Sequence, residues 1–99
     1  MNVMMVRAKI KEENIADAQA ATEKVIQALG QARPADVRYA AAKLSDGVTF
    51  VALLELEPDG GIPLRELPEY AELLENLKQW YAEPPTVEHM TVVGSYQLF

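Results

Sequence analysis

The stretch from Arg38 to Glu57, RYAAAKLSDGVTFVALLELE, predicts a β-hairpin with apolar residues on both of its faces. Asp46-Gly47 between two runs of β-forming residues is a strong signal for a two-residue type I′ turn. If the hairpin closes at this turn, the numbers of directly opposed residues add up to 93. This register determines which side chains share a face of the ribbon.

The two faces of the hairpin are less different in polarity than those of an ordinary outer strand pair. One face, which we expect to pack on the core, contains Phe50 and pairs Tyr39 with Leu54, Ala41 with Ala52 and Val37 with Leu56. The other face pairs Leu44 with Thr49, Ala42 with Val51, Ala40 with Leu53 and Arg38 with Glu55. Because the middle of this second face is also apolar, we expect something other than water to cover it.

Apolar residues at helical spacing predict two helices outside the hairpin. The first is expected to run from Glu12 to Gly30, with Gly30 as its C-terminal cap. The second is expected between Leu67 and Tyr81, with Pro68 in its first turn and Glu83-Pro84-Pro85 as its end.

Four segments alternate or concentrate apolar residues as strands do: Asn2 to Lys11, Val37 to Leu44, Val48 to Glu57 and Thr86 to Phe99. The predicted order is therefore β-α-β-β-α-β. This order indicates a ferredoxin-like α+β fold, in which two helices cover one face of a four-stranded antiparallel sheet. A length of 99 residues suits a single domain over residues 1–99.

The uncovered face of this sheet is expected to gather apolar side chains from three strands: Val3, Met5, Ala40, Ala42, Val51 and Leu53. An exposed apolar patch of several hundred Å² usually marks an interface or a ligand groove. Burying it contributes on the order of 25 cal/mol per Å². Packing against a second copy around a two-fold axis is the simplest cover, so we expect a homodimer. Two sets from the last strand could join this face: Val93, Ser95 and Gln97, or Val92, Gly94 and Tyr96.

Composition excludes several classes of partner and site. A net charge of -6, with only nine Lys and Arg residues, disfavours nucleic acid and anionic membranes as partners. The chain has no Cys, so disulfides and thiolate chemistry are excluded. No apolar run approaches the roughly 20 residues that a membrane helix needs. We therefore expect a cytoplasmic protein.

Three features of the chain occur together: a Met- and Val-rich opening strand, the hairpin AAAKLSDGVTFVALLELEPDG and the tail WYAEPPTVEHMTVVGSYQLF. In this layout the chain resembles the dimeric α+β barrel superfamily, and within it the antibiotic biosynthesis monooxygenase-like proteins. The resemblance implies homodimers in which two sheets form a barrel with a ligand cavity. Members of this superfamily oxygenate quinol-like aromatics without metal or flavin, degrade haem, isomerise lactones, or have no known activity. The implied activity is a cofactor-independent monooxygenase acting on a quinol-like substrate.

The resemblance also implies candidate site residues. Cofactor-free oxygenases of this group surround an aromatic substrate with Asn, Trp, Tyr and Arg, and the haem-degrading branch uses Asn, Trp and His. The residues of these types here are Asn2, Arg7, Arg38, Trp80, Tyr81 and His89. His89 lies beyond Pro84-Pro85 and not on the second helix, which disfavours haem. We expect no metal and no cofactor.

The chemistry of these residue types leaves two interpretations open for each. His89 is the one side chain that titrates near neutrality without perturbation, so it is a candidate acid or base or else a surface histidine. Trp80, Tyr81 and Tyr39 could line a pocket for a flat ligand or could simply fill the core.

Arg38 and Glu55, with Arg7 expected nearby on the adjacent strand, form the most site-like group. Two guanidinium groups on a half-buried face could hold a carboxylate or enolate oxygen. The alternative is a structural salt bridge. No P-loop, metalloprotease or nucleophile-elbow motif is present. Three functions remain. The first is a protein that binds a small apolar or aromatic ligand, in the form of a monooxygenase, and the second is a non-catalytic dimer. The third is a small isomerase or dehalogenase-like enzyme, which would need His89 or an acidic residue facing a cavity.

Overall fold

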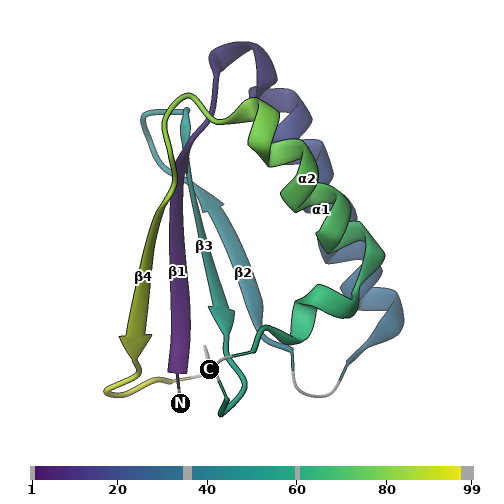
Figure 1. Ribbon diagram of the computed structural model, residues 1–99, viewed down its shortest axis with the longest axis vertical. Helices are drawn as coiled ribbons and strands as arrows, with labels where there is room; N and C mark the ends of the chain where they lie inside the picture. Colours follow the sequence, from purple (N-terminus) through teal and green to yellow (C-terminus); the bar gives the residue numbers. More distant parts are fainter. Residues whose placement is uncertain (1, 35–36, 60, 97–99) are drawn as a thin grey trace.

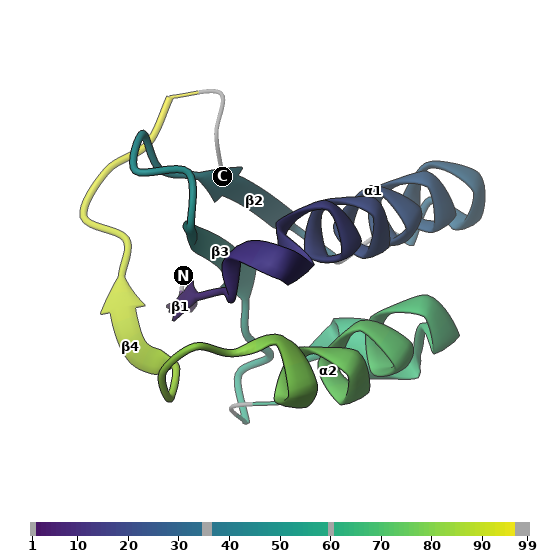
Figure 2. The same ribbon diagram turned by 90° about the horizontal axis from the view of Figure 1, so that it is seen from above.

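The computed structural model describes residues 2–34, 37–59 and 61–96. In chain order its elements are β1 (Asn2–Lys9), η1 (Glu12–Asn14), α1 (Ile15–Ala32), β2 (Tyr39–Lys43), β3 (Thr49–Glu55), η2 (Pro63–Glu66), α2 (Pro68–Trp80) and β4 (Thr86–Thr91). The four strands form one antiparallel sheet in the order β2-β3-β1-β4. Figures 1 and 2 show both helices on the same side of this sheet. The predicted ferredoxin-like α+β fold is confirmed.

The register predicted for the hairpin is confirmed, but the predicted turn type is wrong. Tyr39 opposes Leu54 and Ala41 opposes Ala52, as expected. A type I′ turn needs positive φ at both central residues, and in the hairpin only Gly47 has it, at 78°. Instead the carboxylate of Asp46 accepts hydrogen bonds from the backbone N–H of Val48 and Thr49 and from the Thr49 hydroxyl. The resulting four-residue loop has the same centre as the expected turn, which preserves the register.

The first helix differs from the prediction at both ends. Residues Glu12–Asn14 form the short 3-10 helix η1, so α1 begins at Ile15 instead of Glu12. Gly30 lies inside α1, and the C-terminal cap is Arg33, in the left-handed conformation with φ 47° and ψ 52°. Its backbone N–H donates to the carbonyl of Leu29 at 2.8 Å. Pro34 follows directly, and the residue before a proline is kept out of the right-handed helical region, so α1 ends there without a glycine. Pro68 is the first residue of α2, as predicted.

All four predicted strands are longer than the observed ones, although the two hairpin strands differ by only one or two residues at each end. The first strand ends at Lys9, after which only Ile10 forms an isolated bridge, to Tyr81. The last strand ends at Thr91 instead of continuing toward Phe99. Neither of the two alternative sets from the last strand therefore extends the sheet, and residues 97–99 lie outside the described part. No helix among the described residues is long and apolar enough to cross a membrane.

The core lies between the sheet and the helices in two clusters. The larger contains Val25, Leu54, Leu64, Tyr70 and Leu73, and the smaller contains Ala8, Ile10 and Ala18. The predicted core face of the hairpin supplies Leu54, which is 1% exposed, and Phe50, which packs on the smaller cluster. Ala41 was expected in this core and is exposed, because β2 is the edge strand and its small side chains do not reach α1.

The face opposite the helices is partly covered within one chain. Val3 is 0% exposed, and Met5, Val51 and Leu53 are half-buried. Figure 2 shows the chain that follows β4 running along this side. Ala40 and Ala42, which share this face, are exposed. The apolar area left open is therefore smaller than the sequence suggests and is concentrated toward the β2 edge.

Candidate functional site

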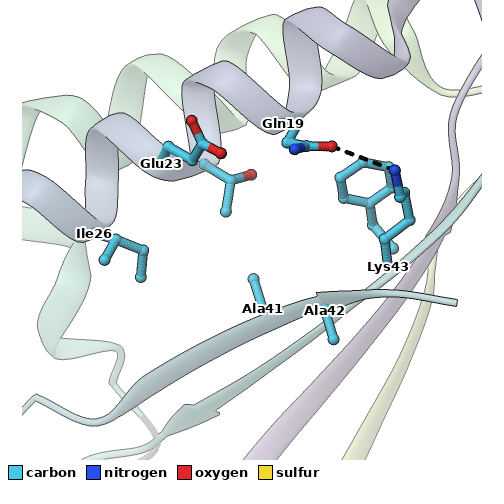
Figure 3. A pocket seen from close by; sticks show the side chains of 8 residues that line it. Gln19, Glu23, Ile26, Ala41, Ala42 and Lys43 are labelled. Atoms are coloured by element: carbon cyan, nitrogen blue, oxygen red, sulfur yellow. Dashed lines mark hydrogen bonds between the residues drawn. The ribbon is translucent and has the colours of Figure 1, made fainter.

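A groove of about 310 Å³ lies between α1 and the edge strand β2 (Figure 3). Helix α1 contributes Gln19, Thr22, Glu23 and Ile26 to its wall, β2 contributes Ala41, Ala42 and Lys43, and β3 contributes Phe50. The volume is at the lower end of the range for small-molecule sites, roughly 300–1,000 Å³. We call this feature the α1–β2 groove.

The groove follows from the sequence of the two elements that form it. Gln19, Thr22, Glu23 and Ile26 are spaced i, i+3, i+4 and i+7, so they form one stripe on α1. Opposite this stripe, β2 presents Ala41, whose methyl group cannot fill the distance between a helix and a sheet. Small residues on an edge strand therefore leave a hollow beside a packed core.

The groove is polar at one end and apolar at the other. At the hairpin end, Lys43 Nζ donates a hydrogen bond to Gln19 Oε1 at 3.4 Å. Figure 3 shows Ile26 at the opposite end, with Glu23 on the helix wall and Ala41 on the strand between the two ends. The Thr22 hydroxyl donates to the carbonyl of Ala18 at 2.8 Å. The site can thus hold a small ligand with an apolar body and a polar head.

Arg38 and Glu55, predicted from the register, do form an ion pair, with Arg38 Nε 3.4 Å from Glu55 Oε2. The Glu55 side chain is 22% exposed and that of Arg38 is 51% exposed. Arg7 does not join them. Arg7 opposes Val51, which lies four residues from Glu55 in β3. At the rise per residue of a β-strand, Val51 and Glu55 are about 13 Å apart.

The three aromatic candidates pack on the other side of the sheet. Tyr39 and Tyr70 pack edge to face, with ring centroids 6.2 Å apart. Burial is the main cause, and the charge of the neighbouring Tyr70 is the second cause, of the rise in the pKa of Tyr39 to about 12. Trp80 packs against both core clusters. Tyr81 packs on the smaller one, and burial raises the pKa of its phenol.

The sheet itself therefore separates the predicted arginines from the predicted aromatics. Arg7 and Ala8 are neighbours in β1 and point to opposite faces, and Ala8 belongs to the cluster against which Trp80 packs. Within one chain, Arg7 and Arg38 do not share a pocket with Trp80, Tyr81 or Tyr39.

His89 lies on the edge strand β4, opposite Met4, and is exposed. It lines an open depression of about 370 Å³ with Asn2, Leu56, Pro58, Asp59, Met90 and Thr91. No group of three or more His, Asp or Glu residues that could hold a metal ion occurs in the described part of the chain.

None of the predicted site residues lines the α1–β2 groove. The sequence does contain a signal for it, which is the Tyr39–Lys43 run with its three alanines, placed on an outer strand. The polar stripe of α1 is the second half of that signal. Sequence reasoning missed the groove because it assigned Ala41 to the core.

Comparison with known proteins gives matches only among solved structures. No protein-family model matches the chain, and no curated protein sequence matches it. A Nitrosomonas europaea protein provisionally named an antibiotic biosynthesis monooxygenase aligns with a TM-score of 0.79 at 19% identity, over 95% of this chain and 100% of the other. A second antibiotic biosynthesis monooxygenase structure aligns with a TM-score of 0.71 at 18% identity, again over 95% and 100%.

SnoaB, a cofactor-independent oxygenase from Streptomyces nogalater, aligns with a TM-score of 0.66 at 13% identity, over 97% of this chain and 96% of SnoaB. Identities this low establish a shared architecture and leave the chemistry of each site to its own residues. The resemblance expected from the sequence is confirmed for the architecture. This chain has the fold of the antibiotic biosynthesis monooxygenase-like proteins.

Proposed function

We propose that this protein is a homodimer that binds a small, largely apolar aromatic ligand in the α1–β2 groove and acts on it as a cofactor-independent monooxygenase. The observation that carries the proposal is the groove itself, with one lysine at its polar end and apolar walls at the other. A structural neighbour described as a cofactor-independent oxygenase supports the type of chemistry.

In this proposal the protein binds and orients an aromatic substrate that bears a hydroxyl group. Lys43 stabilises the phenolate that forms when the hydroxyl loses its proton, since a cation beside a developing anion lowers the free energy of that anion. Phe50 and Ile26 exclude water from one side of the ring. The ring, held in orientation by the groove, then adds O₂ at a carbon that bears hydrogen. Loss of water from the resulting hydroperoxide leaves a quinone carbonyl, so the substrate itself supplies the four electrons that O₂ accepts.

The predicted arginines define a second place for the same chemistry. If two sheets face each other in a homodimer, the Arg38 and Glu55 pair lines the space between subunits, and Arg7 lies on the same face. Anion stabilisation by Arg7 or Arg38, with His89 as an acid or base, stays a prediction for that space. The experiment below separates the two locations.

Oxygen uptake with quinol-like aromatics under air tests the proposal. We expect uptake above the buffer rate, and a loss of about tenfold or more in Lys43→Met, on the scale of removing one group that stabilises charge. Lys11→Met, at an exposed lysine outside the groove, is the matched control and should retain the rate. Loss in Arg7→Ala and Arg38→Ala with retention in Lys43→Met would instead place the reaction between the subunits.

A non-catalytic binding protein of the same fold is the second candidate. It is favoured by the packing of Tyr39 and Trp80 within the core, because these aromatic side chains are then not beside the α1–β2 groove to contact a substrate. Absence of oxygen uptake with every quinol, together with saturable binding of an aromatic compound, would support this candidate and rule out the oxygenase.

A further inference from the structure

We propose that the ligand of the α1–β2 groove is an aromatic α-amino acid, bound as its zwitterion. This inference rests on the proposed role of the groove as a ligand site, and it differs from the oxygenase proposal in pairing Lys43 with a carboxylate instead of a phenolate. It is drawn from the two charged side chains of the groove, Glu23 and Lys43, which come from opposite walls (Figure 3).

These two charges are available to a ligand. Across the described ranges of the chain, four ion pairs form, and neither Glu23 nor Lys43 takes part in any of them. Lys43 makes one hydrogen bond, to the Gln19 side-chain oxygen, and at 3.4 Å it is a long one. No other acidic or basic residue lines the groove, so its formal charge sums to zero.

The polar end of the groove is built to donate to a carboxylate. The Lys43 ammonium has three N–H donors, of which Gln19 uses one. Because the Gln19 oxygen accepts that bond, its amide NH₂ keeps two further donors at the same end. A carboxylate placed there gains charge-assisted hydrogen bonds, which are stronger than those between neutral groups.

One helical turn from Gln19 along α1, the groove offers hydrogen-bond acceptors instead of donors. Glu23 follows Gln19 by four residues, a spacing that places side chains about 5–6 Å apart on one face. The neighbouring Thr22 hydroxyl uses its hydrogen on the Ala18 carbonyl, which leaves its oxygen free to accept. An ammonium group beside the ligand carboxylate therefore meets a carboxylate and a hydroxyl oxygen.

The remaining wall suits the side chain of such an amino acid. The apolar members of the lining are Ile26, Ala41, Ala42 and Phe50. Phe50 opposes Lys43 across the β2–β3 pair. When Lys43 binds the carboxylate of the ligand, the aromatic ring of the ligand therefore lies beside the ring of Phe50. A simple anion is repelled by Glu23 and a simple cation by Lys43, whereas a zwitterion satisfies both.

Three probes that differ by single groups test the inference: L-phenylalanine, 3-phenylpropionate, which lacks the ammonium, and 2-phenylethylamine, which lacks the carboxylate. We expect titration calorimetry to show binding of L-phenylalanine, with each analogue weaker by about tenfold, because each loses a charge-assisted contact. Chemical-shift changes in NMR spectra are expected at the groove residues on binding of L-phenylalanine.

Two variants and their matched controls sharpen the test. Glu23→Gln should bind 3-phenylpropionate and L-phenylalanine with equal affinity. Lys43→Met should bind L-phenylalanine and 2-phenylethylamine with equal affinity. The control variants Glu13→Gln and Lys11→Met change exposed charged residues outside the groove. Neither control should change the ratio of the affinity for L-phenylalanine to the affinity for either analogue. Equal affinities for the three probes in the wild type, or no binding of L-phenylalanine at millimolar concentration, would overturn the inference.

The outcome is independent of the oxygenase proposal, because L-phenylalanine has no phenol to oxidise. Binding of L-phenylalanine without oxygen uptake by any quinol supports the zwitterion site and rejects the oxygenase. The opposite result is oxygen uptake with an uncharged quinol at a rate that Glu23→Gln does not change, together with no binding of L-phenylalanine. That result supports the oxygenase and rejects the zwitterion site.

Discussion

Gly30 lies within α1, two residues before the end of the helix, and a Cβ atom built at this position meets no heavy atom within 4 Å. Replacing Gly30 with alanine should therefore raise the free energy of unfolding by about 0.5–1 kcal/mol, because alanine loses less backbone entropy than glycine when it becomes helical. Urea denaturation followed by circular dichroism measures this change.

Gly47 provides the control for Gly30. A Cβ atom at Gly47 also meets nothing within 4 Å, but its φ is +78°, which an L side chain rarely adopts. Gly47→Ala should therefore lower the free energy of unfolding although the space at the two positions is the same. A stabilising Gly47→Ala, or a destabilising Gly30→Ala, would contradict this account of the two glycines.

Tyr39 should make stability depend on pH in the alkaline range. Burial raises the pKa of its phenol to about 12 from 10.0, so the folded state holds this proton more tightly than the unfolded state. The stabilisation is fully present below pH 10 and is lost as pH rises toward 12. Tyr39→Phe keeps the ring and removes the titrating group, so the variant should lose less stability between pH 10 and pH 12 than the wild type.

Denaturant unfolding at a series of pH values measures how steeply the free energy of unfolding of Tyr39→Phe falls as pH rises. Burial also raises the pKa of Tyr70 and Tyr81, so part of the dependence should remain in the variant. Tyr96, whose side chain is 86% exposed, supplies the control Tyr96→Phe. An unchanged alkaline slope in Tyr39→Phe would show that Tyr39 does not hold its proton through burial.

Individual side chains were predictable where a local turn sets the pairing. The Arg38 and Glu55 pair follows from the hairpin register, which the four residues between Leu44 and Thr49 determine. The position of Arg7 depends on how β1 pairs with β3, across a connection that contains α1. No local signal in the sequence fixes that register, so the proximity of Arg7 to Arg38 was predicted wrongly.

At the scale of single elements, the β2–β3 hairpin depends on Asp46. Its carboxylate accepts bonds at 3.0 Å from Val48 N, 2.9 Å from Thr49 N and 2.6 Å from Thr49 Oγ1. Asp46→Ala should lower the melting temperature, since two backbone N–H groups of the loop lose their protein partner. Thermal unfolding by circular dichroism measures the change.

A second substitution at Asp46 separates hydrogen bonding from backbone preference. Asp46→Asn keeps an oxygen that accepts hydrogen bonds and a residue type that favours turns, so its melting temperature should lie between those of the wild type and Asp46→Ala. If Asp46→Ala melts at the wild-type temperature, the carboxylate does not stabilise the hairpin loop.

Elements were predicted well where periodicity is strong and poorly where an edge is involved. Helix α2 begins at Pro68 as expected, because a proline is tolerated only in the first turn. The α1–β2 groove escaped prediction because alternation assigns a residue to a face of the sheet and does not show how far a helix extends over that face. Ala41 has the predicted orientation but lies beyond the cover of α1.

For the whole molecule, the alternation of apolar residues suffices to specify the architecture. Structures at 13–19% identity share the fold over more than nine-tenths of each chain, so few individual side chains are required for it. Site chemistry is different, since it depends on single residues such as Glu23 and Lys43. This difference explains why the fold was predicted from the sequence while the groove was missed.

The proposed homodimer is testable at the open part of the sheet face. Ala40 is exposed on that face, opposite the half-buried Leu53, and Ala41 is exposed on the other face of the same strand. Ala40→Lys should dissociate a sheet-to-sheet dimer, because it would bury an unpaired ammonium group in the interface while leaving the folded monomer intact. Ala41→Lys adds the same charge to the same strand and should leave the dimer in place.

Sedimentation equilibrium at micromolar concentration distinguishes these outcomes, with circular dichroism to establish that each variant is folded. The wild type and Ala41→Lys should sediment at twice the chain mass of 11.0 kDa, and Ala40→Lys at the chain mass. A wild-type protein that sediments as a monomer would remove the space between subunits in which Arg7 and Arg38 could act. The α1–β2 groove would survive that result, because every residue that lines it belongs to one chain.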